Sequence, residues 1–264
     1  MWYLFIALFT NVLLWIYGVI GNFGIAIILF TILIRVITWP LNAAQVKGAQ
    51  AMQELQNDKD WQEIQKKYAK DREKLAQEQM RVYKEKGINP FGSCLPTLIQ
   101  FPVIIGLYQS ITRALSSTPL SMLQLMRTVE NFPIHFLSIE NIIPLNSKFL
   151  WMNLGSPESI RILGYAVPTL AVIVALTTYV QSKLTMPTST NPNDQSAAMS
   201  GMMSIYMPLL LGWFALNFAS GISVYFITSN LLGVAQYAAT GRANWRNLLP
   251  GGNKQPVSST RKKK

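Results

Sequence analysis

Five stretches of the chain are almost entirely apolar and approach the length of a membrane-crossing helix, which takes roughly 20 residues. They occupy residues 22–40, 95–111, 162–181, 202–218 and 222–237. Only 13% of the residues are charged, against about 25% in soluble domains, so a water-facing surface is difficult to build. The sequence therefore predicts an all-α membrane protein with five transmembrane helices, and the short gap between the last two predicts a tight antiparallel turn.

Lys and Arg gather in two polar segments. Residues 41–92 carry ten of them against eight acids, and residues 241–264 carry seven with no acid. Because cytoplasmic loops retain Lys and Arg, both segments are expected inside, with the N-terminus outside and the C-terminus cytoplasmic. Residues 112–161 then form an external loop, residues 182–201 a cytosolic loop, and residues 238–264 a basic cytosolic tail.

The first 21 residues are also apolar, but Gly18, Gly21 and Asn22 leave too little chain to reverse direction before the next span. We expect a helix lying in the outer interface, where amphipathic aromatic side chains act as anchors. A signal peptide is the alternative, although a positively charged n-region and a small-residue cleavage site are missing. The expected anchors are Trp2, Tyr3, Trp15 and Tyr17.

The segment 41–92 is dense in Gln, Glu, Lys, Ala and Leu, which favour helices. It predicts a cytosolic helical hairpin whose two arms are separated at Asn57 and Asp58. Opposite charges three or four residues apart, such as Glu63 with Lys66 and Lys67, support the second arm. Its apolar residues form an incomplete stripe, which favours a mobile hairpin over a docked one; they are Trp61, Ile64, Tyr68, Leu75 and Val82.

Arg35 lies inside the first predicted span, between Ile34 and Val36. A charge at the bilayer centre costs about 2.5 to 3.5 kcal/mol on insertion scales and usually faces water or a partner. No Asp or Glu lies within any of the five spans. One interpretation is that Arg35 extends its guanidinium to the inner interface. The other is that it faces a hydrated cavity open to the cytoplasm, where a polar segment of a client protein can be received.

Other polar residues at membrane depth suit such a cavity, although each can instead hydrogen-bond a neighbouring membrane helix. They are Thr31, Gln100, Asn217, Ser229, Asn230 and Gln236. Pro102, Pro168 and Pro208 also fall in predicted spans. There they free backbone carbonyls that a cavity can satisfy, so kinks are expected.

The residue inventory argues against catalysis and cofactors. The chain has one cysteine, Cys94, and one histidine, His135, which excludes an internal disulfide, a Cys-based zinc cluster and multi-His metal chemistry. No Gly-rich phosphate loop occurs, which argues against a nucleotide-driven motor. Neither Ser–His nor two-Asp protease chemistry can be assembled within the spans. We therefore expect no enzymatic activity, no metal and no cofactor.

Several motifs between residues 23 and 237 resemble, in order and spacing, those of the YidC/Oxa/Alb family of membrane protein insertases, in its compact bacterial form. They are Gly24–Ile28, Thr31–Arg35, Pro40-Leu41, Leu75–Met80, Asn89-Pro90 through Pro96, Gln100–Pro102 continuing to Tyr108, and Val224–Asn230. Two places depart from the family pattern. Residues 57–61 stand where relatives have a proline-led turn, and Gly221-Ile222-Ser223 replaces a Pro-Gly-Leu-like turn.

The resemblance implies a hydrophilic groove that is open to the cytoplasm and to lipid but closed on the outer side. Arg35 matches the groove arginine, and Thr31 and Gln100 match groove-lining positions. Tyr225 and Phe226 match an aromatic pair that clients contact. Two further groove candidates, chosen for their polarity at membrane depth, are Asn217 and Asn230.

The resemblance also implies that residues 45–86 capture clients, and the candidate contacts there are Trp61, Ile64, Tyr68 and Leu75. The implied function is insertion of nascent membrane proteins into the lipid bilayer of a bacterial plasma membrane, without nucleotide hydrolysis. The ribosome and the Sec translocon are further expected partners, and DNA is not. The terminal basic cluster predicts contact with either anionic lipid or ribosomal RNA; it comprises Arg261, Lys262, Lys263 and Lys264.

Two other functions remain as alternatives. A secondary transporter also keeps polar residues at membrane depth, but it predicts an internal repeat and often ionisable coupling residues. The chain shows no five-span repeat and no intramembrane carboxylate. A membrane assembly factor or scaffold without insertase activity is harder to separate from an insertase by sequence.

Overall fold

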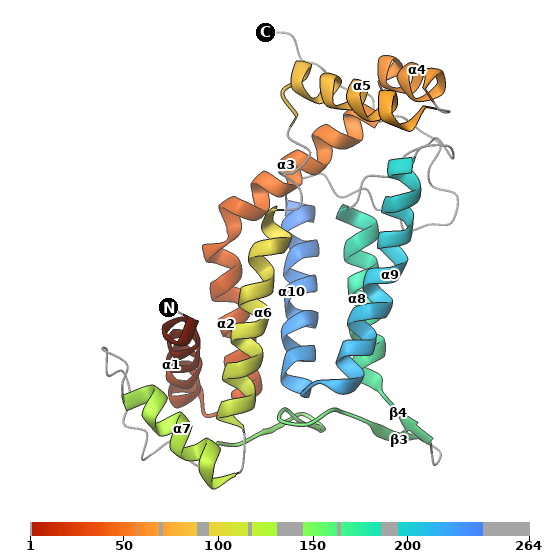
Figure 1. Ribbon diagram of the computed structural model, residues 1–264. Helices are drawn as coiled ribbons and strands as arrows, with labels where there is room; N and C mark the ends of the chain where they lie inside the picture. Colours follow the sequence, from red (N-terminus) through yellow and green to blue (C-terminus); the bar gives the residue numbers. More distant parts are fainter. Residues whose placement is uncertain are drawn as a thin grey trace.

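The computed structural model describes residues 2–56, 58–68, 71–88, 95–115, 118–130, 145–162, 165–185 and 195–239. Five helices coincide with the apolar stretches and run side by side (Figure 1). They are α2 (Phe23–Ile37), α6 (Leu95–Ala114), α8 (Thr169–Thr185), α9 (Gln195–Asn217) and α10 (Ser220–Ala239). The mostly helical architecture agrees with the predicted fold class.

The helix α10 occupies the middle of this bundle, packed along α8 on one side and along α2 on the other (Figure 1). Only Phe218 and Ala219 separate α9 from α10, which confirms the predicted tight turn. Even so, α9 packs along α8 far more closely than along α10. Side chains from α2, α6, α8 and α10 meet in the main core; the most deeply buried include Phe23, Ile27, Leu107, Ile111, Val174 and Tyr225.

The N-terminal helix α1 (Trp2–Ile20) packs against α2, α6 and α7 (Pro119–Glu130). Figure 1 views it almost along its axis, so α1 lies across the other helices. Trp2, Tyr3 and Trp15 are about half exposed, as expected for anchors. The prediction for Tyr17 is wrong: its ring is buried against Phe23, and its hydroxyl accepts a hydrogen bond from the Asn146 N–H at 2.9 Å.

The boundaries of the helices differ from the predicted spans most strongly at α8. Residues 160–162 and 165–167 form two short strands, β3 and β4, so α8 begins at Thr169 rather than at residue 162. Pro168 therefore precedes the helix and frees no carbonyl inside it, whereas Pro102 and Pro208 do lie within helices. Within the described residues, α1 alone is long and apolar enough to cross a membrane by length and composition, while α2 and Ser204–Asn217 are shorter apolar helices.

The segment that was predicted as an external loop contains regular structure. Besides α7, it holds a hairpin of β1 (Lys148–Phe149) and β2 (Met152–Asn153). At its end, β3 (Ile160–Ile162) pairs with β4 (Tyr165–Val167), which lies in the predicted third span. The start of α10 docks on this segment: the Ser220 N–H donates to the Ser156 carbonyl at 2.9 Å, and the Gly221 N–H donates to the Leu154 carbonyl at 3.0 Å. The segment therefore lies across the lower end of the bundle in Figure 1.

The predicted hairpin consists of three helices, α3 (Trp39–Gln56), α4 (Lys59–Lys67) and α5 (Arg72–Glu85). The expected break at Asn57 and Asp58 is present, but a second break divides the expected second arm between Tyr68 and Asp71. The side chain of Asp58 accepts the Asp60 N–H at 3.0 Å and begins α4, while that of Asp71 accepts the Lys74 N–H at 3.1 Å and begins α5. These are N-caps, which favour Asp because its side chain satisfies a free helical N–H.

Candidate functional site between the helices

The guanidinium of Arg35 points from the end of α2 toward α10. Its Nε donates to Ser229 Oγ at 3.1 Å, and its Nη2 donates to the same oxygen and to the Ser229 carbonyl, both at 2.7 Å. The side chain is half-buried. No Asp or Glu occurs in the sequences of α2, α6, α8, α9 or α10, so Arg35 is a cation that neutral oxygen atoms hold within a helical bundle.

One face of α10 carries the polar side of this site. Tyr225, Ser229, Gly233 and Gln236 follow one another at three- and four-residue spacing, which places them on the same side of a helix. Gly233 lies beside the guanidinium: a Cβ added there would approach Gln181 Nε2 to 2.7 Å and Arg35 Nη2 to 3.5 Å. The absence of a side chain at position 233 therefore gives Arg35 and Gln181 room to lie against the backbone of α10.

A second polar contact lies one turn earlier along α10. The side-chain amide of Gln100 on α6 donates to the hydroxyl of Tyr225, whose ring is buried. Phe226, the other half of the predicted aromatic pair, is 9% exposed and belongs to the main core. The structure therefore brings Gln100 and Tyr225 next to the Arg35 site, and it buries both aromatic rings rather than presenting them on the surface.

Asn230 faces α8 instead of Arg35. Its side-chain amide donates to Thr177 Oγ1 at 3.1 Å and to Thr178 Oγ1 at 2.9 Å. These bonds join α10 to α8 within a buried interface. The contact matches the interpretation that a polar residue at membrane depth ties two helices together.

Thr31 and Asn217 also lie apart from the guanidinium contacts. Thr31 is fully buried, and its hydroxyl donates to the Ile27 carbonyl of its own helix at 2.7 Å. Asn217 is exposed at the last residue of α9, where its amide donates to the Trp213 carbonyl at 2.8 Å. Since α9 ends at the α9–α10 turn, Asn217 lies at the opposite end of the bundle from Arg35.

Sequence reasoning missed the contribution of α8, namely Thr177, Thr178 and Gln181. Three polar side chains within five residues of an apolar stretch were the available signal. Their contacts with α10 join residues about 50 positions apart, such as Asn230 and Thr178 with a separation of 52. Spacing along one helix does not reveal a pairing of this kind.

The helical hairpin α3–α5 has a small hydrophobic core of its own, so several of its apolar side chains are not exposed for contact with a client. Leu55, Trp61 and Val82 are buried together, and Ile64, Tyr83 and Ile88 pack on them. The expectation of an incomplete stripe is therefore wrong for Trp61, which is 1% exposed and is not a surface available to a partner. Tyr68 and Leu75 are half-buried. The exposed side of α5 presents Met80, beside Ala76 and Lys84.

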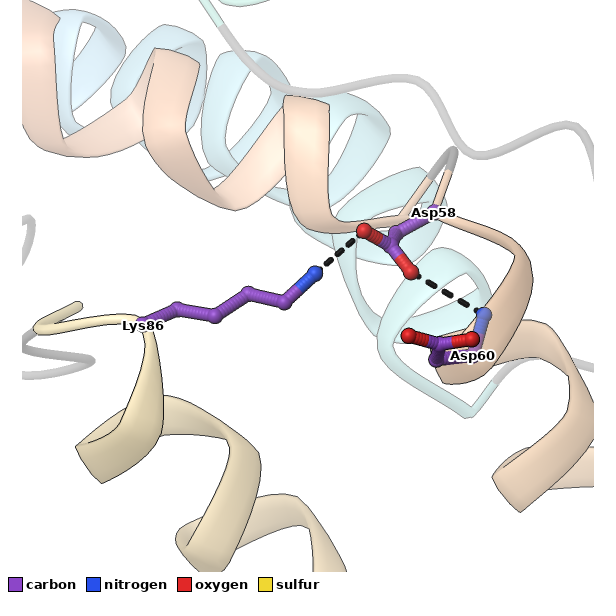
Figure 2. A network of polar contacts seen from close by, with 3 residues as sticks. All are labelled: Asp58, Asp60 and Lys86. Atoms are coloured by element: carbon purple, nitrogen blue, oxygen red, sulfur yellow. Dashed lines mark hydrogen bonds and ion pairs between the residues drawn. The ribbon is translucent and has the colours of Figure 1, made fainter.

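An ion pair closes the hairpin next to this core. The Nζ of Lys86, after α5, bonds the Asp58 carboxylate at the start of α4 (Figure 2). The bond from Lys86 lowers the pKa of the Asp58 carboxyl below its usual value. Among the described parts of the chain, no group of three or more His, Cys, Asp or Glu residues lies close enough to hold a metal ion. Cys94, His135 and the terminal cluster Arg261–Lys264 lie outside the described residues.

The site is thus a half-buried cation without a carboxylate, set between mostly apolar helices and next to a charged hairpin. The chain matches the family model described as 60Kd inner membrane protein over residues 15–246. It is 35% identical over 221 residues to the membrane protein insertase YidC of Oceanobacillus iheyensis, covering 81% of this chain and 73% of that protein. It therefore belongs to this family of membrane protein insertases.

Other relatives that the chain matches are also membrane protein insertases. The insertase MisCA of Bacillus subtilis is 33% identical over 219 residues, which cover 81% of this chain and 69% of that protein. YidC of Nitratidesulfovibrio vulgaris is 34% identical over 236 residues, but this chain spans only 38% of its length. A crystal structure of an active YidC insertase matches with a TM-score of 0.51 and 27% identity, covering 86% of this chain and 43% of that one.

Proposed function

We propose that this membrane protein insertase receives client segments beside Arg35, in a hydrophilic groove between α2, α6 and α10 that is wetted from the cytoplasm. The observation that carries the proposal is the cation itself, bound to Ser229 without any carboxylate. A guanidinium satisfied only in part by neutral oxygens keeps an attraction for an acidic segment.

The proposed mechanism needs no nucleotide. Moving a short polar tail and its backbone through hydrocarbon is the costly step, because no water satisfies the peptide groups there. A cavity wetted from one side shortens the dry path, and Arg35 attracts an acidic tail for a short time. Burial of the client's apolar span in lipid then supplies the driving free energy.

The proposed topology has five membrane-spanning helices. The N-terminus lies outside, and the helical hairpin lies in the cytoplasm of a bacterial cell. The retention of Lys and Arg in residues 41–92 and 241–264 supports it. The α10 helix has 20 residues, about 30 Å at 1.5 Å per residue, which matches the hydrocarbon thickness of a bilayer.

The hairpin is proposed to meet clients first, through the outward side of α5. Met80 is 46% exposed there, next to Ala76, with Arg81 and Lys84 beside it. Methionine adapts to apolar partners of different shapes. Trp61, which is buried, supports this surface from inside. The basic tail is proposed as a contact with the ribosome or with anionic lipid, and the Sec translocon as a further partner.

Reconstitution of the purified chain in liposomes tests the proposal. A single-span client with a short acidic external tail should insert without nucleotide, and Arg35→Ala should slow insertion about tenfold, or about 1.4 kcal/mol. Arg35→Lys keeps the charge and should retain much of the activity. Arg113→Ala is the matched control, because it removes a half-buried cation from the last turn of α6, at the opposite end of that helix from Gln100.

Two results would contradict the proposal. Equal insertion by Arg35→Ala and the parent chain, for clients with acidic tails, would remove the role of the charge. Folded parent chain that inserts no client in liposomes would favour a scaffold without insertase activity of its own.

A further inference from the structure

The turn of the β1–β2 hairpin carries two adjacent apolar side chains that are exposed. Leu150 is 74% exposed and Trp151 is 54% exposed. The stem beside them is anchored: Met152 is 5% exposed, and the Phe149 ring packs so closely on Gly24 that no Cβ fits at position 24. The hairpin is therefore held in the core through Phe149 and Met152, and its large exposed apolar side chains are at its tip.

The backbone at the tip is strained. Leu150 has a φ of 53°, in the left-handed region that bulky residues with a Cβ rarely adopt. A glycine or asparagine would adopt it more easily. Strain of this kind persists where the surrounding structure enforces it, and it is a reason to ask what the exposed residue does.

The segment that carries the tip lies beside the first turn of α10, whose 20 residues match the thickness of a bilayer. The Ser156 carbonyl accepts hydrogen bonds from the Ser220 N–H at 2.9 Å and from Ser220 Oγ at 2.6 Å. The segment that carries the tip is thus bonded to the first residue of α10. In the proposed topology, on which this inference rests, that residue marks the outer boundary of the hydrocarbon, where tryptophan is enriched in membrane proteins.

The indole N–H of Trp151 has a hydrogen-bond partner within the protein, so the ring can lie in partly apolar surroundings without an unsatisfied donor. Its Nε1 donates to Glu158 Oε1 at 3.2 Å. The same carboxylate accepts the Thr169 hydroxyl at 2.8 Å and the Leu170 N–H at 3.0 Å, at the start of α8. The polar atom of the ring therefore has a partner inside the protein, and the position of the ring is fixed relative to α8.

We propose that Leu150 and Trp151 insert into the outer leaflet at the boundary between headgroups and acyl chains, and that this tip anchors the external segment to lipid. Two side chains offer far less area than the roughly 1,000 Å² that a specific protein interface requires. A lipid surface needs no such area and accepts an apolar tip of this size. The neighbouring Lys148 is exposed on the same strand and suits contact with lipid phosphate.

Site-directed fluorescence on the full chain in vesicles of phosphatidylcholine and phosphatidylglycerol tests this proposal. Cys94 is first replaced by Ser, and an environment-sensitive probe is attached in turn to Leu150→Cys, Trp151→Cys, Leu209→Cys and Ser159→Cys. Leu209 is 65% exposed on α9 and reports on a lipid-facing helix. Ser159 is an exposed polar position of the same external segment.

The expected result is that a nitroxide lipid labelled near its headgroup quenches the probe at residues 150 and 151 strongly, while aqueous iodide quenches it several-fold less than at Ser159. Quenching by iodide equal to that at Ser159, with Leu209 still quenched by lipid, overturns the tip proposal and leaves the spanning helices in place. Protection from both quenchers means that protein covers the tip and also overturns it. If Leu209 escapes a nitroxide lipid labelled along its acyl chain, the proposed topology fails and the tip proposal fails with it.

Discussion

Arg35 owes its position to a single residue of another helix. Ser229 supplies the hydroxyl and the carbonyl that its guanidinium binds, from 194 positions away in the sequence. The unusual residue could be recognised in the sequence, because a lone charge inside an apolar run is conspicuous. Ser229 was one of several polar candidates at membrane depth, but its pairing with Arg35 could not be predicted, because only the packing of α2 on α10 joins the two.

The Ser229→Ala variant distinguishes two contributions of Arg35 to insertion, its charge and its position. Losing the Oγ acceptor should cost about 0.6 kcal/mol of stability, the average for hydrogen bonds between membrane helices, and no more than about 1.7 kcal/mol. The charge remains, so insertion of clients with acidic tails should fall by less than the tenfold expected for Arg35→Ala. Insertion rates in liposomes and thermal unfolding in detergent measure the two effects.

Asn230→Ala is the matched control for that variant. It lies one residue further along α10 and loses bonds to Thr177 and Thr178 but none to Arg35. It should lower stability by a similar amount and leave insertion by the folded protein unchanged. A loss of insertion as large as that of Arg35→Ala would mean that Asn230 contacts clients directly.

At the scale of elements, the helical hairpin was predicted as two helical arms but consists of the three helices α3, α4 and α5. Its composition predicted helices, and Asn57 with Asp58 predicted the first break. The second break follows from Asp71, whose side chain begins α5, but a charged residue within a charged stretch gave little warning of it. The buried cluster was missed because Leu55 and Val82 come from α3 and α5 and meet across Trp61 only after both breaks form.

Asp58→Asn tests the ion pair that closes the hairpin. Asn remains a good N-cap for α4 but loses the charge that pairs with Lys86, which should cost about 0.2 to 1 kcal/mol. Because Lys86 lowers the pKa of Asp58, this contribution is present above the ordinary carboxyl pKa of about 4 and disappears as the pH falls through the lowered value. Amide hydrogen exchange in α4 should be faster in the variant at neutral pH and equal to the parent well below that range.

The control for this experiment is Asp71→Asn, which changes the other cap of the hairpin. Its partner Lys74 is highly exposed, so the charge should contribute little to exchange in α4. The hairpin as a whole is expected to open readily. Within the described residues the buried Trp61 indole N–H has no acceptor, and such a group costs about 1 to 3 kcal/mol.

Replacing residues 50–84 with a flexible Gly/Ser linker should leave the five-helix bundle assembled and sharply reduce insertion. The buried cluster consists of residues of the hairpin itself, and within the described residues the hairpin packs on the bundle mainly through contacts of α3 with α2 and α6. Protease resistance and thermal unfolding of the bundle measure assembly, and liposome insertion measures capture. Misassembly would show that the hairpin is structural, and normal insertion would show that the groove is sufficient without it.

For the whole molecule, composition and charge placement indicated a helical membrane protein, and its family membership agrees with that. The arrangement of the helices was not predictable, because α9 pairs with α8 rather than with its neighbour α10. Membrane helices are all apolar, so hydrophobicity does not choose their partners, and close packing of small residues does. Gly212 on α9 shows this: a Cβ there would lie 3.2 Å from the Cβ of Ala175 on α8.

The proposed topology can be measured on sealed inverted vesicles and on intact cells. A membrane-impermeant thiol reagent should label Ser159→Cys from outside and Gln77→Cys only from the cytoplasmic side, with Cys94 replaced by Ser in both. Both positions are exposed, so burial does not explain a failure to react. Labelling of both from the same side would contradict a crossing of the membrane by α6, which lies between the two positions.

The bonds that tie α10 to the external segment also bear on how the sequence can change over generations. The N–H groups of Ser220 and Gly221 donate to the carbonyls of residues 156 and 154, and backbone groups are the same for almost every amino acid. Substitutions at neighbouring positions can therefore accumulate without opening this end of the bundle, as long as position 221 is not proline, which has no N–H to donate. Position 221 is more constrained in this chain, because a Cβ there would lie 3.1 Å from side-chain atoms of both Ile27 and Ile111, so Gly221→Ala should lower the stability of this end of the bundle.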